Sequence, residues 1–85
     1  MQALQEPVIT SRQRQVVELI AQGLSNEEIG VALGISPRTA KAHSDALRQK
    51  LGVTRRRQIP VAFRIATGED PLATRLASAR ADNGG

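Results

Sequence analysis

Apolar residues recur three and four positions apart near the start of the chain, as they do in an amphipathic helix packed on a core. The positions are Val16, Val17, Leu19, Ile20 and Leu24. Thr10 to Gln13 reads T-x-x-Q, a capping box in which side chains at both ends satisfy free backbone N–H groups. Gly23 provides a C-terminal stop. The pattern therefore predicts a first helix over residues 11–22.

A second capping box, S-x-x-E over residues 25–28, begins a shorter apolar pattern that ends at Gly34. The apolar face consists of Ile29, Ala32 and Leu33. This predicts a second helix of about two turns. Gly30 lies inside it, where glycine costs about 1 kcal/mol relative to alanine. We interpret Gly30 as a point where another helix passes too close for a larger side chain.

A third helix is predicted from Pro37 to Leu51, with Ser36 as its N-cap and Gly52 as its stop. Only residues 34–36 separate it from the second helix, and Gly34 can take the positive φ that such a short turn requires. This spacing predicts a helix-turn-helix. No alternating strand pattern is present in the sequence, so the expected fold is all-α.

A fourth helix is expected to close the core and to end at Gly68. Its core face would consist of Ile59, Phe63 and Ala66. Pro60 cannot lie deep in a helix, so this helix should begin near Arg57 or bend there. Val61 and Ile65 fall on the opposite face and form an exposed apolar pair.

The two ends of the chain are expected to lie outside the helical domain, which spans residues 9–68. Residues 1–8 are polar and unpatterned, and they are predicted to be a flexible leader. Residues 69–85 are predicted to be a C-terminal tail. In this tail Asp70-Pro71 starts a short extra helix bearing Leu72 and Leu76, and the remainder is disordered.

Composition excludes several classes of protein. The 85 residues include no cysteine and one histidine, so we expect no metal and no cofactor. The first residues lack the basic and apolar pattern of a signal peptide, so we expect none, and no apolar run is long enough to span a membrane. A cytoplasmic protein without membrane attachment is therefore expected. Phe63 is the single aromatic residue, which leaves no platform for stacking unpaired bases. No nucleophile, base and pocket set is apparent, so we do not expect an enzyme.

Charge is distributed unevenly along the chain. Between Ser36 and Arg57 there are seven basic residues against Asp45 alone, whereas residues 18–33 contain only acidic charges. This asymmetry is typical of a face that binds a polyanion, although a solvated basic surface would look the same. Because the chain cannot stack unpaired bases, the favoured polyanion is double-stranded DNA.

On a helical wheel the third helix turns Ala40, Ser44, Leu47 and Leu51 toward the core. The side chains predicted to reach base edges in the major groove are Arg38, Lys41, Ala42 and Asp45. Asp45 is also within ion-pairing reach of Lys41 and Arg48, and we consider this the stronger reading. The predicted phosphate contacts are Ser36, Thr39, Arg48, Lys50, Arg55, Arg56 and Arg57.

The stretch from Ile9 to Val53, ITSRQRQVVELIAQGLSNEEIGVALGISPRTAKAHSDALRQKLGV, resembles the LuxR/FixJ-type (GerE-like) DNA-binding domain. The resemblance implies a four-helix bundle, a recognition helix at about 37–51 in the major groove, and transcriptional control. By position, it assigns Lys41, Ala42 and Asp45 to bases, and Thr39 and Lys50 to the DNA backbone. It also suggests a homodimer through the fourth helix, by way of Val61 and Ile65, although two scattered surface aliphatic residues would give the same pattern. RNA polymerase is a further candidate partner.

This sequence departs from the family pattern at two positions. Ala40 stands where valine is frequent, which should loosen the packing beneath the recognition helix. Asp45 occupies a site that varies among relatives, so base preference cannot be transferred.

Two other readings stay open at this point. One is a promoter-reading module like region four of a sigma factor, and the other is a helical protein-interaction module acting through Val61, Ile65 and Leu72. Within the favoured reading, the chain is either a free-standing regulator or, as we expect, the output domain of a longer one.

Overall fold

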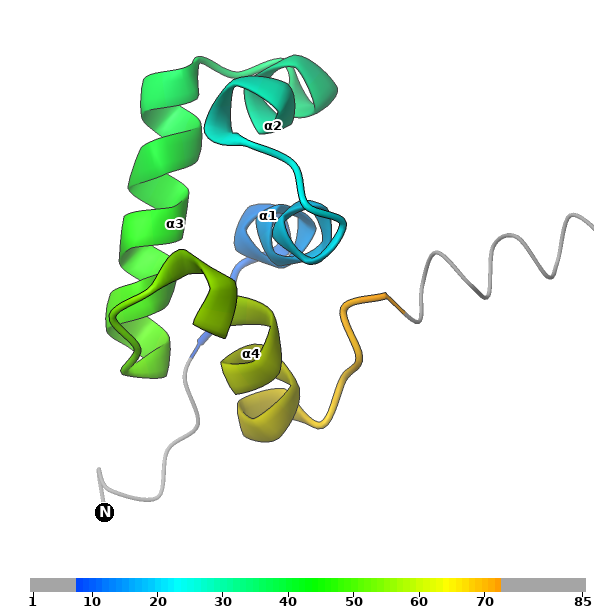
Figure 1. The fold of residues 1–85 in the computed structure, drawn as a ribbon, viewed down its shortest axis with the longest axis vertical. Coiled ribbons are helices and arrows are strands. Elements are labelled where there is room, and N and C mark those ends of the chain that lie inside the picture. Colours follow the sequence, from blue (N-terminus) through cyan, green and yellow to red (C-terminus); the bar gives the residue numbers. More distant parts are fainter. Residues whose placement is uncertain (1–7, 73–85) are drawn as a thin grey trace, which may run out of the picture.

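The structure, a computed structural model, describes residues 8–72. In chain order it contains α1 (Ser11–Ala21), α2 (Asn26–Leu33), α3 (Pro37–Leu51), the 3₁₀ turn η2 (Arg56–Gln58) and α4 (Ile59–Thr67). No strand occurs within the described range. The predicted all-α, four-helix architecture is therefore confirmed (Figure 1).

The first three helices begin where the capping residues predict. Thr10 Oγ1 accepts from the backbone N–H of Gln13 at 3.1 Å, and the Gln13 side chain accepts from Thr10 N–H at 3.1 Å. Ser25 and Glu28 form the second capping box in the same way. Ser36 caps α3 alone, through a 3.0 Å bond that its Oγ accepts from Thr39 N–H.

The turn of the helix-turn-helix explains Gly30. Gly34 takes φ +69°, and Ile35 N–H reaches back to the Gly30 carbonyl at 2.9 Å. A Cβ on Gly30 would lie 2.6 Å from the Ile35 carbonyl oxygen. Our expectation that another helix passes over Gly30 is therefore wrong, because the closest atom is backbone of the turn that leads into α3.

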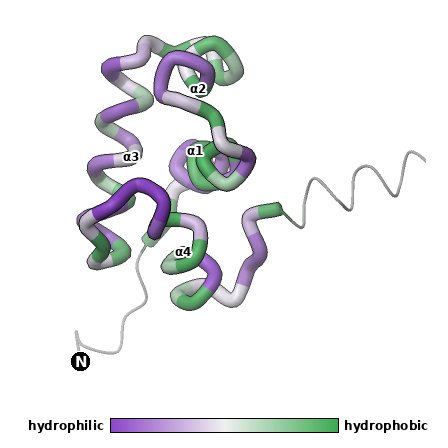
Figure 2. Tube along the Cα trace, viewed as in Figure 1, coloured by the Kyte–Doolittle hydropathy of each residue, from purple (hydrophilic) through white to green (hydrophobic). Residues whose placement is uncertain are grey.

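The core lies around α1, which contacts each of the other three α-helices (Figure 1). All four α-helices contribute to it, with Val16, Val17, Ile20, Ile29, Ala40, Leu47, Ile59 and Phe63. Each of these side chains is at most 8% exposed. Figure 2 shows the contrast with the deeply hydrophilic segment between α3 and α4, which contains the arginine run 55–57. The apolar pattern of the sequence thus corresponds to one core that holds α3 by its inner side.

The last helix differs in part from its prediction. Helical backbone begins at Arg56, close to the predicted Arg57, but its first three residues form the 3₁₀ turn and α4 itself follows at Ile59, with Pro60 in its first turn. Ile59 and Phe63 are buried as expected, whereas Ala66 is half-buried. In α2, Ala32 is exposed, so assigning it to the apolar face was wrong.

The predicted ends of the chain fall mostly outside the described residues. Beyond α4, Asp70 accepts a hydrogen bond from Leu72 N–H at 3.0 Å in a turn, while Leu76 and the rest of the expected extra helix are not described. Of the predicted leader, only Val8 is described. Within residues 8–72, none of the helices has the length and apolar character needed to cross a membrane.

Candidate nucleic-acid interface

Helix α3 presents two faces of different chemistry. Ala40, Ser44 and Leu47 are buried against the core, and Ser44 Oγ donates to the Lys41 carbonyl at 3.1 Å. The opposite side carries the exposed Arg38, Lys41, Ala42 and Gln49. In Figure 1, α3 forms one edge of the described molecule, with the other helices on its inner side. The predicted base-reading side chains Arg38, Lys41 and Ala42 are therefore brought together on one open face.

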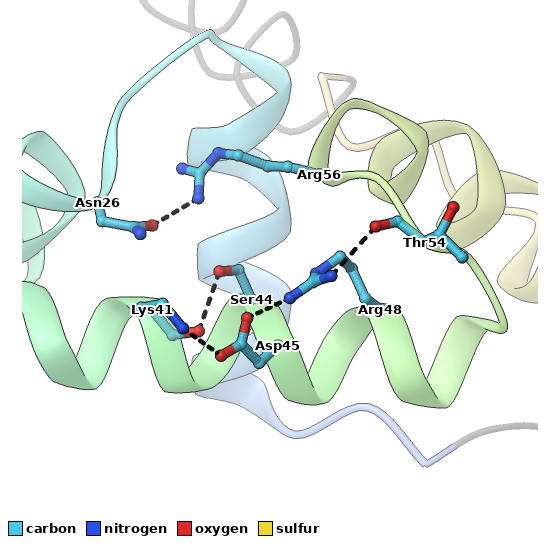
Figure 3. Close-up of polar contacts among 7 residues, drawn as sticks. All are labelled: Asn26, Lys41, Ser44, Asp45, Arg48, Thr54 and Arg56. Carbon is cyan, nitrogen blue, oxygen red and sulfur yellow. Dashed lines mark hydrogen bonds and ion pairs between the residues drawn. The ribbon is translucent and has the colours of Figure 1, made fainter.

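Asp45 lies at the centre of that face and is paired on both sides (Figure 3). Lys41 Nζ donates to its Oδ2 at 2.9 Å, and Arg48 Nη2 donates to its Oδ1. These hydrogen bonds, first that of Lys41 and then that of Arg48, lower the pKa of Asp45 below its usual value. The expected ion pairing of Asp45 is confirmed. We call Lys41, Asp45 and Arg48 the Asp45 cluster.

The N-terminus of α3 is a second exposed element of this surface. Ser36 and Thr39 are both exposed, and their hydroxyl oxygens lie 3.0 Å apart. Free N–H groups and the positive end of the helix dipole make a helix N-terminus favourable for a phosphate. Both hydroxyls are therefore open to solvent at the N-terminus of α3, and their contact with the DNA backbone stays a prediction.

Lys50, a predicted phosphate contact, points elsewhere. Its Nζ donates to the Val8 carbonyl at 2.6 Å and to Gln13 Oε1 at 2.9 Å. Gln13 is 7% exposed and also belongs to the capping box of α1. Lys50 therefore fixes the end of α3 to the start of α1, a role that its position on the wheel did not indicate.

The arginine run 55–57 is divided by the fold. The Arg56 guanidinium donates to Asn26 Oδ1 and, at 2.8 Å, to the Leu24 carbonyl (Figure 3). Burial lowers the pKa of Arg56, although an arginine stays protonated. Arg55 and Arg57 are exposed. Arg56 thus ties the approach to α4 to the start of α2, while its neighbours face solvent.

Arg48 also connects α3 to the loop that follows it. Besides Asp45, its guanidinium donates to the Thr54 carbonyl at 3.1 Å, in the loop after α3 (Figure 3). Sequence reasoning missed the acceptors Asn26, Leu24 and Thr54. The arginines were visible in the sequence, but their partners come from other elements or from backbone carbonyls, which carry no residue signature.

The exposed apolar pair on α4 lies on a face away from the core. Val61 is 63% exposed and Ile65 is 80% exposed, as predicted. They border a shallow groove of about 460 Å³ between the loop after α3 and α4. Its lining consists of Val53, Arg57, Gln58, Val61, Ala62 and Ile65. Among residues 8–72, no group of three or more histidine, cysteine or acidic side chains is arranged to hold a metal ion.

Comparison with known proteins shows the family to which the chain belongs. Residues 7–63 match the model of the bacterial regulatory proteins of the luxR family. The transcriptional regulatory protein UhpA of Escherichia coli is 48% identical over 50 residues, which cover 59% of this chain and 25% of UhpA. The UhpA of Salmonella typhimurium is 42% identical over 64 residues, or 75% of this chain and 31% of that protein.

A shorter relative is matched over most of its length. The spore germination protein GerE of Bacillus subtilis is 41% identical over 56 residues, covering 66% of this chain and 76% of GerE. By contrast, the chain spans only about a quarter to a third of the UhpA proteins. The family match covers residues from just before α1 to the middle of α4, and so includes the whole helix-turn-helix. The chain therefore belongs to the luxR family of bacterial regulatory proteins and carries that family's helix-turn-helix DNA-binding domain.

Proposed function

We propose that this chain binds duplex DNA with sequence preference by placing α3 in the major groove, and that it thereby regulates transcription. The observation that carries the proposal is the open face of α3, where Arg38, Lys41 and Ala42 are exposed while Ala40 and Leu47 anchor the helix from behind. A recognition helix needs such a rigid backing, because base edges are read by side chains held in register.

The proposed base contacts and the proposed phosphate contacts lie at different positions along α3. Arg38 and Lys41 can donate to guanine O6 and N7, and the methyl group of Ala42 can contact a thymine methyl. Ser36 and Thr39 face phosphates from the helix N-terminus, and Arg55 and Arg57 do so from the far end. We no longer count Arg48, Lys50 and Arg56 among the phosphate contacts, because all three donate to acceptors within the protein.

We further propose that two copies associate through α4. The exposed Val61 and Ile65 and the groove beside them form a largely apolar surface, which the same surface of a second copy would cover in a two-fold dimer. A two-fold dimer would read two half-sites arranged as a palindrome. Sedimentation with and without duplex should show a dimer that Val61→Ser/Ile65→Ser removes, and a monomer in both conditions would exclude it.

The larger context is also a proposal. The UhpA relatives are three to four times longer than the segment they share with this chain, so we propose that the chain acts as the output domain of a longer cytoplasmic regulator. Contact with RNA polymerase would then connect DNA binding to transcription. Membership of the luxR family favours this reading over a sigma-factor module.

The experiment is a titration of the chain with random and selected duplexes at several salt concentrations, followed by fluorescence anisotropy. Binding should weaken steeply with salt, and Lys41→Ala should reduce the preference between sequences. No binding to any duplex at low salt would refute the proposal and favour the protein-interaction reading.

A further inference from the structure

The acidic side chain at the centre of a DNA-binding face needs an explanation. Asp45 is the only acidic residue between Ser36 and Arg57, and its side chain is 41% exposed. A carboxylate there repels phosphates and the acceptor atoms of guanine, so it opposes binding to most DNA. Helix α3 would bind nonspecific duplex better without it.

The two cations beside Asp45 are held differently. Arg48 donates to Asp45 and also to the Thr54 carbonyl, so it keeps a protein partner if the carboxylate is removed. Its side chain is 35% exposed. For Lys41, the carboxylate of Asp45 is the partner in the described residues, and its side chain is 66% exposed. Asp45 therefore controls the position of Lys41 more than that of Arg48.

The carboxylate can act on DNA in only one favourable way. It is an acceptor without a donor, and in the major groove the exocyclic amino groups of cytosine (N4) and adenine (N6) are the donors. Lys41, one helical turn earlier, supplies the opposite chemistry, since it donates to guanine O6 or N7. Together they place an acceptor and a donor side by side on the open face of α3, which we call the reading face (Figure 3).

We propose that Asp45 is a specificity-determining residue that retains Lys41 when the duplex is non-cognate and accepts from a base amino group when it is cognate. This inference rests on the proposed DNA binding. On non-cognate DNA, Lys41 stays paired and contributes no phosphate contact. On cognate DNA, an amino group replaces Lys41 at the carboxylate, and Lys41 moves to a neighbouring acceptor.

The test compares the wild-type chain with Asp45→Asn and Asp45→Ala. Preferred duplexes are first selected from a random pool, and affinities for selected and random duplexes are then measured at several salt concentrations. Removing the charge should strengthen binding to random duplex and steepen the dependence of log K on log salt by about 0.9, as expected for one additional phosphate contact by Lys41. The ratio between selected and random affinities should fall about five- to tenfold.

The selection also identifies the base. Wild-type pools should be enriched in cytosine or adenine at one position per half-site, and Asp45→Ala pools should lose that enrichment alone. Which base is enriched distinguishes N4 from N6 as the donor. Substituting other bases only at that position should weaken wild-type binding and leave Asp45→Ala binding unchanged.

Two controls separate this role from net charge. Glu27→Gln removes an exposed acidic charge from another helix, at the start of α2, and should leave the ratio unchanged. In a Lys41→Met background, Asp45→Asn should no longer steepen the salt dependence. If Glu27→Gln reproduces the Asp45 effects, or if Asp45→Asn alters neither the ratio nor the salt slope of a chain that binds DNA, the inference is wrong. A wild-type chain that binds no duplex would refute the proposed function itself.

Discussion

Gly30→Ala should destabilise the protein, although alanine is the better helix former. In the interior of a helix, alanine is favoured over glycine by about 1 kcal/mol. Here the new Cβ would meet the Ile35 carbonyl oxygen at 2.6 Å, whereas carbon and oxygen normally approach to about 3.3–3.6 Å. The turn would therefore have to move by most of an ångström.

The turn has little freedom to make that movement. It contains only residues 34–36, with Gly34 in the left-handed conformation and Ser36 fixed as the cap of α3. Overpacking costs about 1–3 kcal/mol, and losing the bond from Ile35 N–H to the Gly30 carbonyl adds about 1 kcal/mol. After subtracting the helix preference, we expect a net loss of about 1–3 kcal/mol. For a domain of this size, each kcal/mol lowers Tm by about 4–8 °C.

Urea unfolding followed by circular dichroism measures this loss, and Ala32→Gly provides the matched control. Ala32 is exposed in the same helix, so exchanging it should cost at most about 1 kcal/mol through helix preference alone. Gly30→Ala should also weaken duplex binding in conditions where the protein remains folded, because the turn positions α3. A Gly30→Ala variant as stable as the wild type, or more so, would refute the argument from the turn.

Three further predictions test other parts of the structure. Ser36→Ala removes the cap of α3 and should lower the free energy of unfolding by about 1 kcal/mol in the same urea assay; an unchanged midpoint would mean that water replaces the hydroxyl. Arg56→Met should lower the free energy of unfolding by about 1–3 kcal/mol without changing the salt dependence of DNA binding. Arg57→Met should leave the free energy of unfolding unchanged and flatten the slope of log K against log salt by about 0.9. The reverse pattern would contradict the inward position of Arg56. Carbon-13 NMR should place the pKa of Asp45 below the ordinary 3.8, and Lys41→Met should raise that pKa. Because the folded-state pKa is depressed, the stability that the ion pairs contribute is present above pH 3.8 and is lost as the pH falls through the folded-state value. An unshifted pKa would contradict the ion pairs.

The sequence was sufficient for features that depend on neighbouring residues. Thr10, Ser25 and Ser36 each cap the helix that follows them, and the short spacing between Leu33 and Pro37 indicated the helix-turn-helix. Capping involves residues at most three positions apart, so its signature is legible in a linear sequence. The ion pairs of Asp45 were predictable for the same reason, since its partners lie one helical turn away on the same helix.

Contacts between distant segments were not predictable in this way. Lys50 finds its acceptors at Val8 and Gln13, 42 and 37 residues away in the chain. The 3₁₀ form of the turn that leads into α4 was not predicted either; there Gln58 Oε1 accepts from Arg55 N–H at 2.9 Å. A helical wheel shows the side of a helix on which a residue lies, but it does not show which acceptors the fold brings to that side.

The positive charge of residues 36–57 is therefore a poor measure of how many phosphates the domain contacts. Of the five basic residues first predicted to contact phosphate, Arg48, Lys50 and Arg56 donate to acceptors within the protein. Each of the three connects α3 or the approach to α4 to another segment, and together they help to fix the reading face on the core. The exposed Arg55 and Arg57 lie beyond the C-terminal end of α3, while Ser36 and Thr39 lie at its other end. In the proposed complex, phosphate contact would then be concentrated at the two ends of α3, and the region between them, around Lys41 and Asp45, would be left to distinguish bases.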